Sequence, residues 1–106
     1  MDERLFLQVA KAIADPRRLA ILEAITRAGE ITCGELARLF PIGQSTVSHH
    51  VGILERAQLV NVRRQGQYAI FSARPETLKM FLERLNSRLL DVAQTTAQNG
   101  PKEGGP

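Results

Sequence analysis

The 106-residue chain has a single cysteine and no apolar run close to the length of a membrane helix. Cys33 cannot close a disulfide within the chain, and alone it falls short of any two-cysteine metal motif. A membrane helix needs roughly 20 consecutive apolar residues, so we expect no membrane-spanning segment. The first 15 residues carry charges among their apolar positions, unlike a secretory signal, and we therefore expect a cytoplasmic protein.

Acidic side chains are missing from residues 36–54, next to the part of the chain that carries its positive charge. Residues 1–40 and 75–106 each hold equal numbers of basic and acidic groups. The net charge of +3 therefore lies within residues 41–74, where Glu55 is the only acid and the bases are Arg56, Arg63, Arg64 and Arg74. An anionic partner would dock on this third of the chain.

Residue sets typical of enzymes are also missing. We find no serine, histidine and aspartate set, no paired carboxylates that suit a cleft, and no glycine-rich phosphate loop, since Gly52 and Gly66 are isolated. The sequence therefore predicts a protein that is not an enzyme. The length allows one domain with a small core, which we place at residues 1–96, followed by a disordered tail at 97–106 that has little apolar content to bury.

Helical spacing and helix boundaries dominate the first half of the chain. Asp15 and Pro16 suit the start of a helix, so one helix ends before them and a second begins there, ending at Gly29. Thr32 and Glu35 fit a capping box at the start of a short third helix. The break at 41–43 predicts a tight turn into a fourth helix, whose inward positions are Val47, Val51 and Leu54.

The second half changes from helix to strand and back. Residues that favour strands flank Gln65 and Gly66, which predicts a β-hairpin with arginines near its tip. From Pro75 the spacing is helical again, with a seam that would pack along another helix: Leu78, Leu82, Leu85, Leu89 and Val92. The order of helix, turn, helix and hairpin predicts a mainly α fold with a β-hairpin, the winged helix-turn-helix.

The fourth helix has an outer face that suits the major groove of DNA. If its apolar positions face the core, the other side is short, polar and free of acid. Glutamine can make a bidentate contact with adenine, and serine, threonine and histidine can contact bases or phosphates. We predict that DNA is contacted by Gln44, Ser45, Thr46, Ser48 and His49. In the hairpin, Arg63 and Arg64 would contact phosphates or the minor groove, although such charges can also serve only to keep an edge strand soluble.

Four stretches resemble the ArsR/SmtB family of small dimeric transcriptional repressors: ADPRRLAIL, ITCGELARLF, GQSTVSHHVGILERAQLV and VRRQGQYAIF. The resemblance covers nearly all of residues 5–92. It implies a homodimer that represses its own or a neighbouring operon, at a near-palindromic operator in double-stranded DNA, until an effector releases it. The implied dimer interface is built from the first and last helices, and we assign to it Leu5, Phe6, Val9, Leu78, Leu82, Leu85 and Leu89.

The chain departs from the family at its metal sites. Many relatives bind metals through two cysteines in the helix before the turn, but those positions fall on Thr32 and Gly34. No histidine follows His50, so we expect no metal site on the last helix either. The adjacent His49 and His50 point about 100° apart on a helix and cannot share one ion. We therefore predict no metal and no cofactor, and we expect His50 to be half-buried beside the apolar face.

Two alternatives stay open. Cys33 stands at the start of its helix, where a thiol can become reactive, so the repressor could respond to oxidation through it; a small half-buried residue that fills a gap is the other interpretation. The winged helix could also serve as a protein interaction module, because the fold alone does not fix its use. The sequence does not reveal the effector.

Overall fold

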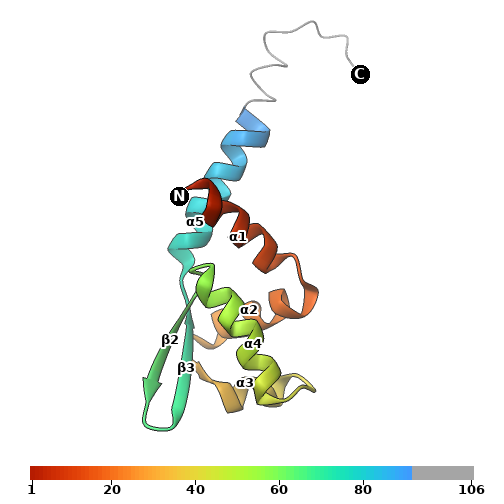
Figure 1. The fold of residues 1–106 in the computed structure, drawn as a ribbon, viewed down its shortest axis with the longest axis vertical. Coiled ribbons are helices and arrows are strands. Elements are labelled where there is room, and N and C mark those ends of the chain that lie inside the picture. Colours follow the sequence, from red (N-terminus) through yellow and green to blue (C-terminus); the bar gives the residue numbers. More distant parts are fainter. Residues whose placement is uncertain (92–106) are drawn as a thin grey trace, which may run out of the picture.

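The computed structural model describes residues 1–91 and consists of a helical body, a hairpin on one side and a long C-terminal helix (Figure 1). The elements are α1 (Glu3–Ile13), α2 (Pro16–Ala28), β1 (Ile31–Thr32), α3 (Cys33–Leu39), α4 (Gln44–Arg56), β2 (Val60–Gln65), β3 (Tyr68–Ala73) and α5 (Pro75–Asn86). A π-helical turn, Ser87–Asp91, continues α5. Val92 of the predicted seam, the end of the predicted domain and the predicted tail at 97–106 lie outside the described residues.

The helix boundaries follow from caps that the sequence predicts. The Asp15 side chain accepts a hydrogen bond from the backbone N–H of Arg18 at 2.9 Å, with Pro16 in the first helical turn. Gly29 ends α2 with φ of 78°, in the region that favours glycine. The capping box is confirmed, because the Thr32 hydroxyl accepts from the N–H of Glu35 at 3.1 Å and the Glu35 carboxylate accepts from the N–H of Thr32 at 2.9 Å.

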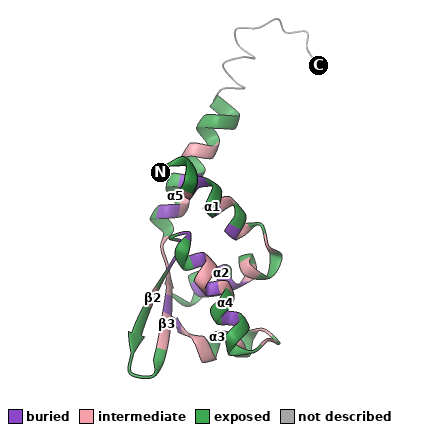
Figure 2. Ribbon diagram, viewed as in Figure 1, coloured by how far each residue is buried: buried purple, intermediate pink, exposed green. Residues whose placement is uncertain are grey.

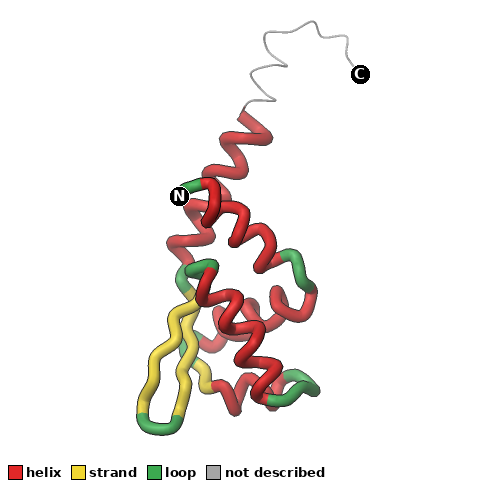
Figure 3. Tube along the Cα trace, in the orientation of Figure 1, coloured by secondary structure: helices red, strands yellow, loops and turns green. Residues whose placement is uncertain are grey.

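The sheet has three strands in the order β1-β3-β2, all antiparallel, and lies beside the helices (Figure 3). The expected hairpin is confirmed as β2 and β3, which turn at Gly66 with φ of 61°. The two-residue strand β1 was not expected; it pairs Ile31 with Phe71 and Thr32 with Ile70. The predicted fold class, a winged helix-turn-helix of mostly helices, is nevertheless confirmed.

The core forms where the helices meet the sheet (Figure 2). Its fully buried members include Ile21 and Ile25 of α2, Leu36 of α3, and Val47 and Leu54 of α4. The inward face predicted for the fourth helix is thus confirmed. None of the described helices is long and apolar enough to cross a membrane.

The first and last helices pack against each other within one chain. The rings of Phe6 on α1 and Phe81 on α5 lie 5.1 Å apart, and Arg84 and Arg88 lie over the Phe6 ring. Phe6 and Val9 are therefore buried within the protomer, with Val9 fully inaccessible. The sequence pattern marked them as apolar contacts, and the family resemblance assigned them to the dimer interface; the structure places both in the chain's own core.

The predicted seam on α5 divides into two parts. Leu78 and Leu85 are half-buried and pack against the core, as does Leu5 of α1. Leu82 and Leu89 remain exposed, at 52% and 62%. Part of the seam is thus already used inside the protomer, and the exposed part continues along the helix that extends away from the body (Figure 1).

Candidate nucleic-acid interface

Helix α4 presents its polar face at the surface because its apolar face is buried in the core. Val47, Val51 and Leu54 are at most 2% exposed, which fixes the rotation of the helix about its axis. The opposite side carries the five residues predicted to contact DNA, and all of them are exposed: Gln44, Ser45, Thr46, Ser48 and His49. Their surface position agrees with the expectation, and contact with DNA stays a prediction.

The N-terminal end of α4 is open to an anion. Its N-cap is Gly43, which has no side chain to accept from the first-turn N–H groups, and no acid lies in the first turn. Free N–H groups and the helix dipole together favour a phosphate at such an end. The same end of α4 and the tip of the hairpin lie at one end of the molecule (Figure 1). Both could therefore reach one duplex.

Cys33, the first residue of α3, packs against α4 and touches two residues of the polar face. Its Sγ is 3.7 Å from the carbonyl oxygen of Gln44 and 3.6 Å from the hydroxyl oxygen of Ser48. The thiol is half-buried. The structure thus gives Cys33 a packing role against α4, and any group added to its sulfur would press on Gln44 and Ser48.

The two hairpin arginines point to opposite faces of the sheet, as neighbours on a strand do. Arg63 Nη2 lies 3.1 Å from both carboxylate oxygens of Glu30, and its Nη1 donates to Gln65 Oε1 at 2.6 Å. Arg64 instead lines the shallow hollow between the hairpin and α4, together with Ser48 and Gly52. Only Arg64 therefore belongs to the side that carries the polar face of α4.

Arg64 is also free of ion pairs within the described part of the chain. Glu55 lines the same hollow, yet no ion pair between the two is formed among residues 1–91. The two arginines thus have different surroundings, and their contact with DNA stays a prediction. Glu30 was not expected to matter, since it lies 33 residues before Arg63 in the sequence and no local pattern connects them.

His50 holds α4 against the corner between α1 and α2. Its Nδ1 lies 3.3 Å from Arg18 Nη1, and Arg18 Nε donates to the carbonyl oxygen of Ala12 at 2.8 Å. Burial lowers the pKa of His50, the Asp15 carboxylate opposes that shift, and nearby cationic groups including Arg18 add to it. His50 is therefore neutral near pH 7 and can accept from Arg18. The expected half-buried position of His50 is confirmed.

Two exposed residues beside the polar face, Tyr68 and Arg38, were not predicted from the sequence. Tyr68, expected only as a strand former, is 56% exposed and lines a groove with Gln44 and Cys33. Arg38 at the end of α3 lines the same groove. The groove forms because α3 follows β1 directly and β1 pairs with β3. No local pattern predicted that pairing. Among residues 1–91, no three metal-binding side chains cluster closely enough to hold an ion.

Comparisons with known proteins agree with this arrangement. Residues 13–63 match a family model described as a helix-turn-helix domain. The chain is 37% identical over 71 residues to the transcriptional repressor SdpR of Bacillus subtilis. The match covers 67% of this chain and 78% of that protein. It is 32% identical over 90 residues to the arsenical resistance operon repressor of Staphylococcus xylosus, covering 85% and 81%.

A solved structure shows the same fold. It is the NMR structure of a homodimeric winged helix-turn-helix DNA-binding domain from Mycobacterium bovis, a possible ArsR-family transcriptional regulator. The TM-score is 0.66 at 22% identity, and the match covers 97% of this chain and 87% of that one. At this identity the likeness concerns the fold.

Proposed function

Because the chain belongs to the ArsR family of winged helix-turn-helix transcriptional regulators, we propose that it is a homodimeric repressor that reads its operator with helix α4. DNA binding and transcriptional regulation follow from the family; repression, the dimer and the contacting residues are the proposal. One observation carries it: the exposed face of α4 is polar, free of acid and ends in uncapped N–H groups. Such a face accepts phosphates and base edges and repels neither.

The residues on this face differ in the DNA groups that their side chains can contact. Gln44 at the start of α4 has the amide needed for a bidentate contact with adenine. Ser45, Thr46 and Ser48 have hydroxyls that pair with bases or phosphates, and His49 can donate to guanine or phosphate. We place the base contacts on these five exposed residues.

In the hairpin, Arg64 is proposed as the phosphate contact. It lies on the α4 side of the sheet and has no ion-pair partner among the described residues. Arg63 has a different part, because its guanidinium is held by Glu30 and Gln65. We propose that Arg63 fixes the hairpin against the strand that follows Glu30 and so positions Arg64.

The dimer is proposed to form through the exposed part of the α5 seam. Leu82 and Leu89 expose apolar surface, and Leu5, Leu78 and Leu85 present half-buried edges beside them. Phe6 and Val9 would pack beneath this surface, inside the protomer, and would not contact the partner. The M. bovis relative of the same fold is homodimeric, which supports the proposal. Two α4 helices related by a two-fold axis call for a near-palindromic operator with half-sites about one helical turn apart.

A footprint on the chain's own promoter tests the proposal most directly. With about six phosphates neutralised per dimer, affinity should fall roughly a thousandfold between about 50 and 200 mM salt. The footprint should cover two half-sites. Failure to protect any DNA, with affinity for a protein partner instead, would support the alternative of an interaction module.

Cys33 supports a second candidate, a repressor that responds to thiol modification. Its Sγ lies within 3.7 Å of the Gln44 carbonyl and the Ser48 hydroxyl, so added bulk would disturb the face that reads DNA. Alkylation by iodoacetamide or treatment with peroxide should then release the operator from the native protein and spare Cys33→Ser. Equal behaviour of the two proteins would exclude this mode of control.

A further inference from the structure

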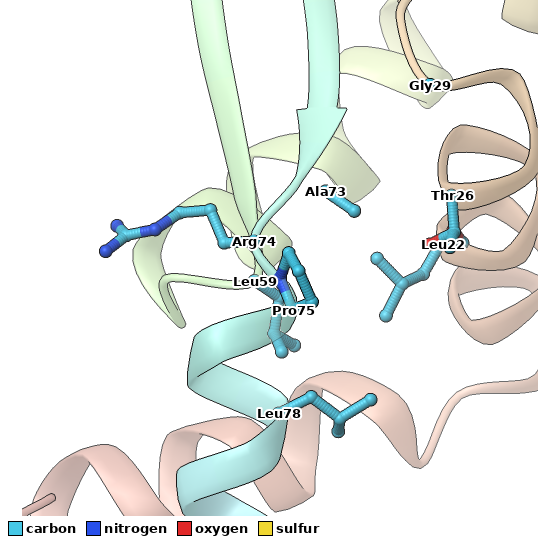
Figure 4. Close-up of a pocket in the computed structure, with 8 residues that line it drawn as sticks. All are labelled: Leu22, Thr26, Gly29, Leu59, Ala73, Arg74, Pro75 and Leu78. Carbon is cyan, nitrogen blue, oxygen red and sulfur yellow. The ribbon is translucent and has the colours of Figure 1, made fainter.

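A pocket of about 300 Å³ opens on the side of the molecule between α2, the end of β3 and the start of α5 (Figure 4). Its lining is Leu22, Thr26, Gly29, Leu59, Ala73, Arg74, Pro75 and Leu78. None of these residues belongs to the set proposed to contact DNA. The side chains of Leu22, Pro75 and Leu78 converge on the opening from three directions (Figure 4).

The chemistry of the pocket limits what it can hold. The Thr26 hydroxyl donates to the carbonyl oxygen of Leu22 at 2.8 Å, and the N–H of Arg74 donates to the carbonyl oxygen of Leu59 at 2.9 Å. The Arg74 guanidinium points away from the cavity (Figure 4) and pairs with Glu76 at 3.3 Å. The polar side chains of the lining are thus already engaged, and a charged ligand would find no counterion inside.

We propose that this pocket binds a small uncharged apolar molecule and that binding adjusts the DNA-binding form of the dimer. The volume fits, because dry apolar cavities of about 150 Å³ already bind benzene, and this pocket is about twice as large. Residues 92–106 of the same chain are poorly suited to fill the pocket, because Val92 is their one branched aliphatic side chain. The regulatory half of the inference rests on the proposed function, whereas the binding half does not.

The position of the pocket explains how a ligand would act. Leu59 lies where α4 meets β2, and Arg74 is the N-cap of α5. The hydrogen bond between them joins the body that carries α4 to the helix proposed for the dimer. A molecule wedged between α2 and Pro75 would change the angle of α5 against that body. In a dimer, this angle sets the separation of the two α4 helices, so the ligand would favour one separation over another.

Binding is tested with N-phenyl-1-naphthylamine, an uncharged apolar fluorophore, and the full chain without DNA. We expect saturable binding of one molecule per chain. Ala73→Phe should fill the pocket and weaken binding at least tenfold, as should Leu78→Gln, which makes the wall polar. Ala14→Phe is the matched control, since Ala14 is an exposed alanine outside the pocket, and it should bind like the native chain. Thermal unfolding shows that each variant is folded.

Several results would overturn the site. The site is excluded if the native chain shows no saturable binding of the fluorophore. It is also excluded if both pocket variants bind the fluorophore as tightly as Ala14→Phe does. Binding that disappears as protein concentration rises through the dimerisation range would show that a second copy covers the pocket.

Regulation is tested separately by operator affinity with and without the fluorophore. A severalfold change in the native chain that is lost in Ala73→Phe supports it; bound fluorophore with unchanged operator affinity overturns it. Operator binding without fluorophore tests the proposed function itself, so the two failures remain distinguishable.

Discussion

Arg63 and Glu30 form a bidentate pair, with Arg63 Nη2 3.1 Å from each carboxylate oxygen of Glu30. The pair joins β2, the first hairpin strand, to the residue before β1, across 33 positions of sequence. Because side chains alternate along a strand, this contact turns Arg63 away from α4 and leaves Arg64 facing it. Two adjacent arginines of equal charge thus have different surroundings.

This difference predicts unequal effects of two otherwise identical substitutions. Arg64→Gln should weaken operator binding and reduce the slope of log affinity against log salt by about one per lost phosphate contact. Arg63→Gln removes the same charge but, with its guanidinium bound to Glu30, should leave the slope nearly unchanged. Fluorescence anisotropy over about 50 to 200 mM salt measures both. Equal slopes for the two variants would contradict the separate roles.

An acid introduced at Ser45 should separate DNA binding from helix stability. Ser45 is exposed in the first turn of α4, where a carboxylate interacts favourably with the helix dipole by about 0.3–1 kcal/mol. Ser45→Glu should therefore keep or raise the melting temperature while it lowers operator affinity about a hundredfold through repulsion of phosphate. Ser45→Ala, which adds no charge, should cost far less. If Ser45→Glu binds the operator normally, the N-terminal end of α4 does not approach the duplex.

Features that depend on residues within about four positions were predictable from the sequence. The Asp15 and Thr32 caps, the glycine that ends α2 and the rotation of α4 all follow from short spacings. The candidate DNA-contacting face was predictable for the same reason, because burying Val47 and Val51 leaves only one side exposed.

Features that depend on distant pairs were not predictable. Strand β1 consists of two residues and exists only because β3 pairs with it. The contacts of Arg63 with Glu30 and of Arg18 with His50 span 33 and 32 residues. Apolar spacing marks which side of a helix is covered and leaves open what covers it. The family resemblance therefore decided the expectation that Phe6 and Val9 lie at a dimer interface, although Phe81 of the same chain packs against Phe6.

The exposed seam predicts which substitutions prevent dimers without unfolding the chain. Leu82→Glu or Leu89→Glu should bury a charge between protomers and yield monomers, with operator affinity lower by about tenfold or more. Leu85→Glu should also disturb the protomer, since Leu85 packs on its core. Light scattering and thermal unfolding separate these outcomes.

A matched control for the seam is Leu39→Glu. Leu39 is 63% exposed at the end of α3, away from α5, and its replacement should leave the oligomeric state unchanged. If Leu82→Glu and Leu89→Glu remain dimeric by light scattering, the interface lies elsewhere on the chain.

His50 predicts a specific loss of stability in mild acid. Burial lowers its pKa in the folded chain, so between that value and the ordinary value of about 6.5 the unfolded chain binds more protons. The free energy of unfolding should therefore fall as pH drops from about 7.5 to 5.5, before Asp15 and Glu35, whose pKa values are lowered by backbone hydrogen bonds, begin to protonate.

His50→Gln should flatten this dependence, because glutamine can still accept from Arg18 and does not titrate. His49→Gln is the control, since His49 is exposed and has no contact with Arg18 in the described residues, and this variant should still lose stability as the pH falls because it keeps His50. Denaturant unfolding at several pH values measures the slopes. If the native chain and His50→Gln lose stability in parallel over this range, neutral His50 does not contribute to the link between α4 and α2.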